Sequence, residues 1–450
     1  MTAPAIAWLR DDLRIADNPA LRAAVDRGGP VVVLFVLDEH SDEQRGLGGS
    51  SRWWLHQSLA ALAADLKARG ATLTLRRGPA EEEVPKLVRE SGADAVFWNR
   101  RYGRTKDIDA RIKKSLREDA VNAESFAANV LVEPWEVTSS GGTPFRVFTP
   151  FWKAERAHPI RDVVAAPPRI DGAPAASDDL EDWGLLPTRP DWAGGLRETW
   201  TPGERGAHDR LERFVREHLE DYGDRDQPAI EATSMLSPHL RFGEVSPVQL
   251  WHRMHGDVPA EARKRVDAFL REVGWRDFNH NILFHFPRLD LDDFRPEWSG
   301  FPWAEPTDDR LARWQQGRTG IPLVDAGMRQ LWQTGWMHNR VRLVTASFLV
   351  KNLLIDWRVG ERWFWDTLVD ADEANNPGNW QWVAGSGADA APYFRVFNPE
   401  LQRRKFDPHD EYVRRWVPEL GSAEYPEPMV DLAESRREAL DAYASLRHGE

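Results

Sequence analysis

The chain has 450 residues, more than one hydrophobic core usually organises, so we expect two domains. It contains no cysteine, which excludes disulfides, thiolate nucleophiles, cysteine-ligated zinc and iron–sulfur clusters held by cysteine. The formal net charge of -13 argues against unspecific nucleic-acid binding by the molecule as a whole, although an acidic protein can carry a local basic face.

Hydrophobic residues make up 41% of the sequence, which predicts a globular protein. No positively charged leader followed by an apolar segment stands at the N-terminus, and charged residues interrupt every apolar run before it reaches the length of a membrane span. We therefore expect a cytoplasmic protein with no membrane partner.

The first third of the sequence alternates β-rich runs with helical patterns. The runs lie at Ala5–Leu9, Val31–Leu37, 72–75 and 95–98. Between them, the leucines of 55–66 form one apolar helical face. Repeated strand–helix–strand units predict a parallel sheet covered by helices. No glycine-rich phosphate loop follows any strand, so these residues alone favour a scaffold over a nucleotide site.

The pattern loosens after residue 133 into sequence rich in Pro, Gly, Asp and Trp, and helical patterns almost without strands follow it. We expect an α/β domain at 1–133, a linker at 134–201 and an all-helical domain at 202–450.

Two stretches, GWRDFNHNILFHFP and GWMHNRVRLVTASFLVKNLLIDW, are predicted as buried helices that carry polar side chains. A buried arginine needs a partner, and Asp370 and Asp372 are plausible partners for Arg342. Taken alone, this pattern favours an internal salt-bridge network. His280 and His285 are five residues apart and lie on different helical faces, so we expect no metal site.

The stretch NNPGNWQW combines amides, a Pro-Gly step and two indoles in a protein with 22 Trp. If it is helical, Trp380 and Trp382 point to roughly opposite sides, and one helix can serve two sites. Any single Trp is more often a core residue than a functional one. A group of them, with Trp357, Trp303 and Trp314, near buried Arg–Asp pairs favours aromatic chemistry around a flavin-like cofactor.

Six stretches resemble motifs of the DNA photolyase/cryptochrome family. They are WLRDDLRIADNPAL, TPFRVFTPFWKA, TSMLSPHLRFGEVSP, GRTGIPLVDAGMRQLWQTGWMHNRVR, LLIDWRVGERWFW and NNPGNWQWVAGSGADAAPYFRVFNP. The sequence most resembles the bacterial photolyases that act on cyclobutane pyrimidine dimers, and within them the class III branch. The resemblance implies an α/β, Rossmann-like N-terminal antenna domain with a parallel sheet, and an all-α C-terminal domain that binds FAD.

The resemblance also implies which residues contact FAD. Positions that match the family's phosphate contacts are Tyr222, Thr233, Ser234, Met235, Leu236 and Ser237. Arg276 matches a further cofactor contact. Arg342 and Asp370 match the pair that lies against the isoalloxazine, with Asp372 beside them. Asn376 matches the residue that faces flavin N5.

Electron transfer and lesion binding are assigned by the same resemblance. Trp380, Trp357 and Trp303 match the chain that photoreduces FAD, although Trp303 needs a one-residue gap. Glu272 matches the carboxyl that hydrogen-bonds the dimer, and Asn339 matches a second contact. A carboxyl that donates must be protonated, so we expect burial to raise the pKa of Glu272.

The remaining matches concern DNA. Trp275 and Trp382 match indoles that stack on the extruded dimer. Arg340, Arg395 and Gln402 match positions near the DNA strand. We expect the basic residues that follow, Arg403, Arg404 and Lys405, to extend a phosphate-binding face. Leu343 stands where many relatives have Met, which is a departure from the family pattern.

The implied activity is that of a deoxyribodipyrimidine photo-lyase: light-driven repair of cyclobutane pyrimidine dimers in UV-damaged DNA by electron transfer from photoexcited reduced FAD. The alternative is a cryptochrome-type blue-light photoreceptor. A repair enzyme for the (6-4) photoproduct is disfavoured, because Asn339 follows His338 where such enzymes need a His pair. The expected antenna is methenyltetrahydrofolate, since NRRYGRTKD lacks the pterin-binding Asn–Glu pair of other bacterial members, and the expected state is a monomer.

Overall fold

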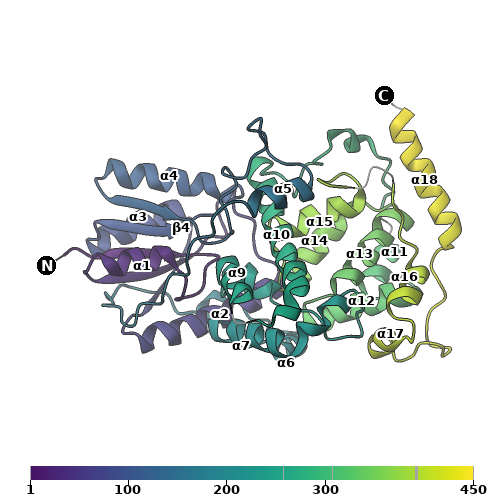
Figure 1. Ribbon diagram of the computed structural model, residues 1–450, viewed down its shortest axis with the longest axis horizontal. Helices are drawn as coiled ribbons and strands as arrows, with labels where there is room; N and C mark the ends of the chain where they lie inside the picture. Colours follow the sequence, from purple (N-terminus) through teal and green to yellow (C-terminus); the bar gives the residue numbers. More distant parts are fainter. Residues whose placement is uncertain (1, 257, 307, 391–393, 449–450) are drawn as a thin grey trace.

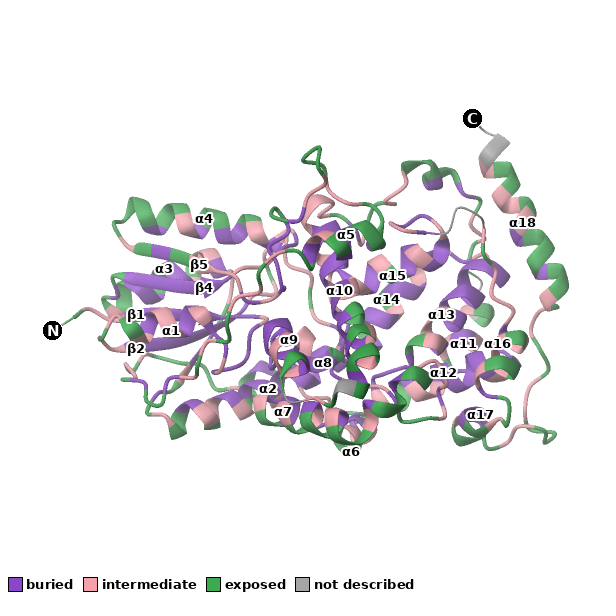
Figure 2. Ribbon diagram, in the orientation of Figure 1, coloured by how far each residue is buried: buried purple, intermediate pink, exposed green. Residues whose placement is uncertain are grey.

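A computed structural model of the chain describes residues 2–256, 258–306, 308–390 and 394–448. The molecule is elongated, with the sheet at one end and the helical part at the other (Figure 1). Buried residues concentrate in the sheet and in the helices at the centre of the molecule (Figure 2). No helix in these ranges is long and apolar enough to cross a membrane.

The N-terminal part is a five-stranded parallel sheet in the order β3-β2-β1-β4-β5. Its strands are β1 (Ala5–Leu9), β2 (Val31–Leu37), β3 (Leu73–Arg77), β4 (Ala95–Asn99) and β5 (Asn122–Phe126). The four apolar strands confirm the sequence prediction. The strand β5 was not predicted, because NAESF is polar and lies at the edge of the sheet, where only one neighbour covers it.

Helices cover both faces of this sheet. They are α1 (Pro19–Asp26), α2 (Gly49–Ala68), α3 (Ala80–Ser91) and α4 (Thr105–Glu118). Ala7 and Leu9 face the core with α1 and α2, whereas Ile6 and Trp8 face the core with α3 and α4. The first of these cores continues into the helical part, where Trp336 belongs to it. The predicted parallel α/β fold is therefore confirmed.

The segment between the sheet and the main helical part is less irregular than its composition suggests. It contains α5 (Phe148–Glu155), the 3₁₀ turn η1 (Glu181–Trp183) and α6 (Gly194–Thr199). The helix α5 packs against α10 (Arg263–His285), and this contact brings α5 to the site described below.

The rest of the described chain is helical, as predicted, apart from one isolated bridge between Ala304 and Ile355. Besides α10, its elements are α7 (Glu204–Arg213), η2 (Phe214–His218), η3 (Glu220–Asp224), α8 (Ser237–Arg241), α9 (Pro247–His255), η4 (Ala260–Ala262), η5 (Pro296–Gly300), α11 (Asp308–Gln315), α12 (Pro322–Thr334), α13 (Asn339–Ser347), η6 (Phe348–Asn352), α14 (Trp357–Thr367), α15 (Asn375–Ala384), α16 (Pro399–Phe406), α17 (Glu411–Trp416) and α18 (Leu432–His448).

One stretch that was predicted as a single helix is interrupted in the structure. The stretch predicted as a single buried helix from Gly335 is divided into α13, the π-helical turn η6 and the start of α14. Leu354 has a positive φ of 53°, which ends the first segment, and the Asp356 side chain accepts a hydrogen bond from the Arg358 backbone to begin α14. The division places Trp357 at the first position of a new helix.

Candidate functional site

A cavity of about 410 Å³ lies between α10, α13 and α15, and we call it the first cavity. The structure brings most of the predicted site residues to its walls: Tyr222, Ser234, Leu236, Ser237, Glu272, Trp275, Arg276, Asn339, Arg342, Asp370, Asp372, Asn376, Trp380 and Trp382. The predicted residues outside these walls are Thr233, Met235, Trp303, Arg340, Trp357, Arg395 and Gln402. Residues from six separate stretches of the sequence, between 222 and 382, therefore meet in one place.

Arg342 and Asp370 form the predicted ion pair in this cavity. The guanidinium donates two parallel hydrogen bonds to the carboxylate, at 3.1 and 2.8 Å. A third, from Nε to the Met337 carbonyl at 2.6 Å, fixes the plane of the guanidinium. The Asp370 side chain is only 3% exposed, so the pair is weakly screened by water. The pair supplies a rigid cation to the cavity.

The amide of Asn376 has a defined orientation. Its Nδ2 donates to the Glu361 backbone carbonyl at 3.1 Å and to Glu361 Oε1 at 2.8 Å, which uses both N–H bonds. Arg45 holds the Glu361 carboxylate with two hydrogen bonds, at 2.6 and 2.8 Å. Because Oδ1 has no hydrogen-bond partner among the described residues, a ligand in the first cavity meets an acceptor at Asn376 and not a donor.

Sequence reasoning missed Arg45 and Glu361. They are 316 positions apart in the chain, and Arg45 lies on the loop after β2. Gly48 allows this loop to approach α14, because a Cβ at that position would lie 2.1 Å from the Trp365 carbonyl oxygen. No local signal in the sequence reports a pair of this kind.

Hydroxyls and one guanidinium line another wall of the first cavity. Ser234 and Ser237 lie there, and Ser237 accepts a hydrogen bond from the Trp336 indole at 3.3 Å. Arg276 donates to the Asn129 carbonyl at 2.7 Å and pairs with Asp277 at 3.0 Å. These are the kinds of donors that bind phosphate oxygens.

Asp372 lies in the wall but is engaged with the protein. Its Oδ1 accepts from the backbone N–H groups of Ala374 and Asn375, at 2.8 and 2.6 Å, and its Oδ2 accepts from the Asn375 amide. Burial opposes ionisation, but His280 and these hydrogen bonds hold the pKa of Asp372 below its usual range. Asp372 therefore anchors the start of α15, the helix that carries Asn376.

The solvent-exposed side of the first cavity, which we call its mouth, carries one carboxyl and two indoles: Glu272 is exposed, and Trp275 and Trp382 are partly exposed. Glu272 has 43% of its side chain exposed and lies 3.7 Å from Arg225. Loss of water around its carboxyl raises the pKa of Glu272, and the Arg225 guanidinium opposes that rise. The predicted direction of this shift is confirmed. A raised pKa favours the protonated form, which can donate a hydrogen bond.

Trp275 is held in place by a residue that sequence reasoning missed. The ring of Phe148, on α5, stacks on Trp275 with centroids 3.8 Å apart and planes 9° apart. One face of Trp275 is thus covered before any ligand binds. Trp382 is fixed by a hydrogen bond from its Nε1 to the Asp389 carbonyl at 3.1 Å. The only sequence signal for Phe148 was its place in the motif TPFRVFTPFWKA.

Trp380 and Trp382 leave α15 in different directions, as predicted. Trp380 is buried beside Phe364, with ring centroids 4.9 Å apart, and beside Trp314, at 6.3 Å. Its ring also presses on α14, because a Cβ added at Gly360 would lie 2.2 Å from Trp380 Cη2. Trp382 is partly exposed instead.

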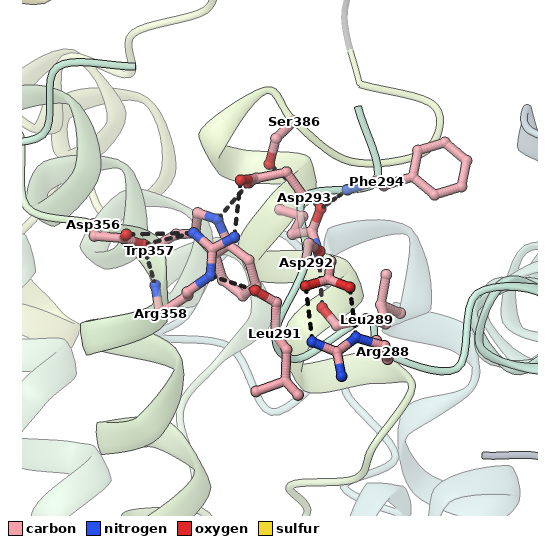
Figure 3. Close-up of polar contacts among 11 residues, drawn as sticks. Arg288, Leu289, Leu291, Asp292, Asp293, Phe294, Asp356, Trp357, Arg358 and Ser386 are labelled. Atoms are coloured by element: carbon pink, nitrogen blue, oxygen red, sulfur yellow. Dashed lines mark hydrogen bonds and ion pairs between the residues drawn. The ribbon is translucent and has the colours of Figure 1, made fainter. Parts of the chain in front are cut away.

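Trp357 and Trp303 lie outside the walls of the first cavity. Trp357 is on α14, one turn before Gly360, and is fully buried. Its Nε1 donates to Asp293 at 2.9 Å (Figure 3). Trp303 is partly exposed, and the backbone bond from Ala304 to Leu354 at 2.8 Å brings it to the segment that leads into α14. Trp380 and Trp357 are buried and Trp303 is partly exposed. This order suits a route for electrons between the first cavity and the surface.

The residues predicted to contact a DNA strand lie outside the first cavity. Arg340 pairs with Asp226 at 2.8 Å and lies over the Phe406 ring, and Arg395 is exposed. Gln402 is on α16 and is partly exposed. Arg403 is held by the carboxylates of Glu400 and Asp410, so the exposed cations of this helix are Arg404 and Lys405.

A second cavity of about 130 Å³ lies where the sheet meets the helical part. It shares Leu240, Arg276 and Asp372 with the first cavity, so the two are separated by one layer of side chains. Its walls include the charged residues Arg10, Asp11, Asp38, Glu39, Arg45, Arg100, Arg101, Arg241, Arg276, Asp372 and Glu373. Among the described residues none forms a hydrogen bond or ion pair with the Glu373 carboxyl, and burial, followed by repulsion from Asp11, raises the pKa of Glu373 to about 7.

Comparison with known proteins identifies this arrangement. The model of the family described as DNA photolyase matches residues 5–169, and the one described as the FAD binding domain of DNA photolyase matches residues 269–424. The chain is 46% identical to the deoxyribodipyrimidine photo-lyase of Agrobacterium fabrum, over 99% of this chain and 98% of that protein. Cryptochrome-2 of Arabidopsis thaliana is 38% identical, over 93% of this chain and 71% of that protein.

A solved structure gives the same result. The crystal structure of a bacterial class III photolyase from Agrobacterium tumefaciens superposes with a TM-score of 0.94 at 45% identity, over 100% of this chain and 98% of that chain. Both family models, the relatives and the fold agree with one another. The chain belongs to the DNA photolyase/cryptochrome family.

Proposed function

We propose that the protein is a deoxyribodipyrimidine photo-lyase that uses FAD and light to reverse cyclobutane pyrimidine dimers in DNA. One observation carries the proposal: the first cavity joins an oriented set of polar groups at its depth to a carboxyl and two indoles at its mouth. The relatives named above as photo-lyases support the same activity at higher identity than the cryptochrome does.

The donor set of the first cavity suits FAD. Ser234, Ser237 and Arg276 provide hydroxyls and a cation for the phosphates, with Tyr222 beside them. Arg342, in the cavity wall, would hold the flavin ring, where its positive charge would favour the reduced, negatively charged state. Bound FAD supplies light absorption and one transferable electron.

Asn376 is the residue that we place against flavin N5. Its amide is turned so that Oδ1 accepts, because both N–H bonds are engaged by Glu361. An acceptor suits N5 when it carries a proton, as in reduced flavin, and not when N5 is itself an acceptor, as in oxidised flavin. The orientation of one amide thus favours the state that repair requires.

The mouth of the cavity accepts the lesion. Photolyases are among the enzymes known to extrude their target from the duplex, at a cost of a few kcal/mol. Stacking on Trp275 and Trp382 offsets that cost, since base–aromatic stacking contributes about 1–3 kcal/mol per base. Glu272, protonated, donates to a pyrimidine carbonyl and stabilises the negative charge that the dimer gains, and Asn339 provides a second hydrogen bond.

The DNA strand lies over the face that carries Arg340, Arg395 and Gln402, with Arg404 and Lys405 as further phosphate contacts. Such contacts give affinity without sequence preference, and that affinity weakens as salt rises. Binding of a damaged strand to this face needs no second subunit, so we propose that the monomer is active.

The second cavity is our proposed site for the antenna, methenyltetrahydrofolate. The Glu373 carboxyl, which no described residue hydrogen-bonds, suits the N–H edge of a pteridine. The shared wall of Leu240, Arg276 and Asp372 keeps such a chromophore one side-chain layer from the flavin. Extraction of the purified protein, followed by absorbance spectra of the released chromophores, tests this assignment.

The central experiment is loss of cyclobutane dimers from UV-irradiated oligonucleotides incubated with purified, reduced protein under blue light and in darkness. We expect loss in the light alone. Protein that holds FAD and photoreduces normally, but removes no dimers, would overturn the repair function and favour a cryptochrome-type blue-light photoreceptor.

A further inference from the structure

The indole nitrogens of Trp380 and Trp357 have opposite surroundings. The buried Nε1 of Trp380 has no hydrogen-bond partner among the described residues, whereas Nε1 of Trp357 donates to the Asp293 carboxylate at 2.9 Å. We propose that Asp293 is a positioning and charge-stabilising residue that makes Trp357 easier to oxidise than Trp380, so that an electron hole moves outward and does not return. This inference rests on the electron-transfer role proposed for the two tryptophans.

The charges around Trp357 support this direction. Asp293 is 4% exposed and pairs with Arg358 at 2.8 Å, as Figure 3 shows. The Arg358 guanidinium also lies over the Trp357 ring, 4.5 Å from its centroid, where a cation alone would oppose oxidation. Asp356 lies 3.3 Å from the same guanidinium. Two carboxylates and one guanidinium leave a formal charge of -1 beside the indole, and charge acts strongly where water is excluded.

The position of Asp293 is fixed by the helix that carries Trp380. Gln381, the next residue on α15, donates to the carbonyls of Leu289 and Asp292 at 2.7 and 3.0 Å and accepts from the Phe294 N–H at 2.8 Å. From the other side, Arg358 donates to the Leu291 carbonyl at 2.7 Å. The loop that carries Asp293 is therefore held between α14 and α15, the two helices that carry Trp357 and Trp380.

The step that Asp293 favours is a single electron transfer. One electron passes from the Trp357 indole to Trp380, which has already lost an electron to the photoexcited flavin. Trp380 becomes neutral again and Trp357 carries the positive charge. No covalent bond breaks, and the Nε1 proton of Trp357 remains in its hydrogen bond to Asp293. The partly exposed Trp303 then lies on the side from which Trp357 is refilled.

The test is flash photolysis of the FAD-loaded protein, with the lifetime of the oxidised tryptophan as the readout. Asp293→Asn keeps an oxygen acceptor for Nε1 but removes the negative charge, and we expect an approximately tenfold shorter lifetime, about the effect of one nearby charge. Asp293→Glu keeps the negative charge, so this variant should keep most of the parent's lifetime of the oxidised tryptophan. Asp292→Asn is the matched control, since the Asp292 side chain is 60% exposed and, among the residues that the structure describes, forms an ion pair only with Arg288.

A second variant tests the sign of the effect. Arg358→Gln removes the cation and leaves both carboxylates, so we expect a longer lifetime, the opposite of Asp293→Asn. A residue that merely holds the fold would shorten the lifetime in both variants, and that result would overturn the proposal. Ultraviolet resonance Raman spectra of the FAD-free protein report the indole hydrogen bond independently. If the Trp357 N–H signal is the same in the parent and in Asp293→Asn, the hydrogen bond from Trp357 Nε1 to a charged Asp293 carboxylate is contradicted.

Trp357→Phe separates this inference from the proposed function. If Trp357→Phe leaves photoreduction unchanged, the electron route itself is wrong and the inference falls with it. If Trp357→Phe slows photoreduction but Asp293→Asn behaves like Asp292→Asn, the route stands and the role of Asp293 is overturned.

Discussion

The two cavities share a wall but are built differently. In the first, protein partners orient the polar groups: Arg342 is held by three hydrogen bonds, and Asn376 has both N–H bonds engaged. In the second, the Glu373 carboxyl has no hydrogen-bond partner among the described residues, and burial raises its pKa to about 7. The comparison shows that protein partners orient the polar groups of the first site, whereas the second leaves a carboxyl that no described residue hydrogen-bonds.

The largest effect is expected at the ion pair of the first cavity. Arg342→Met leaves the Asp370 carboxylate, 3% exposed, without its cation, and breaking such a buried pair costs about 3–5 kcal/mol. FAD content, measured from the flavin absorbance of purified protein, should fall severely. Arg104→Met is the control, because it breaks the Arg104–Asp290 pair, which lines neither cavity. Equal FAD loss in both variants would mean that the fold, not the site, was damaged.

Glu272→Ala should separate the mouth of the first cavity from its depth. A hydrogen bond to a charged group contributes about 1.5–3 kcal/mol, so dimer splitting should fall at least tenfold while FAD content stays the same. The yield of repaired dimers per absorbed photon measures the first quantity, and the flavin absorbance measures the second. A parallel loss of both would make Glu272 a structural residue.

Glu373→Gln tests whether the carboxyl in the second cavity makes the stability of the protein depend on pH. A carboxyl whose pKa is raised from 4.5 in the unfolded chain to about 7 in the fold contributes stability that is full below the lower value and is lost as pH rises through about 7. In protein without an antenna, the variant should therefore be more stable than the parent at about pH 8, by about 1–2 kcal/mol, and not at about pH 5. Melting temperatures across this range provide the measurement, and parallel curves for the two proteins would contradict it.

The smallest effect is expected for the orientation of one amide. In Glu361→Gln the new amide can donate to Asn376 Oδ1, which frees Nδ2 to face the flavin and favours its oxidised state. The flavin reduction potential should fall by the equivalent of about 1 kcal/mol, roughly one hydrogen bond. Spectroelectrochemical titration measures the shift. An unchanged potential would show that Asn376 keeps its orientation without Glu361.

The sequence predicted the strands correctly where apolar runs are buried on both faces of the sheet. The strands β1 and β2 are fully buried, and they were predicted at their observed bounds. The polar edge strand β5 was missed, because periodicity reports burial and an edge has little. The break at Leu354 was also missed, since a leucine with a positive φ carries no local signal and is imposed by the packing around it.

The site was predictable where its residues lie in motifs, and much less where it depends on contacts between distant segments. A buried arginine requires a carboxylate, which left Asp370 and Asp372 as candidate partners of Arg342, and the family resemblance then singled out Asp370, the partner that the structure shows. Arg45 and Phe148, which hold Glu361 and Trp275, were not foreseen, since each acts across more than a hundred residues of sequence. The residues that line the first cavity are thus easier to predict from sequence than the residues that orient them.

The contact between Trp380 and Gly360 has a consequence for how the protein responds to cold. The indole lies directly on the backbone of α14, with no room for even a methyl group between them. A ring held in this way cannot swing, so its electronic coupling to Trp357 does not depend on loop motions that freezing stops. We therefore expect the first electron transfers to persist in a frozen glass, in which DNA exchange and product release have ceased.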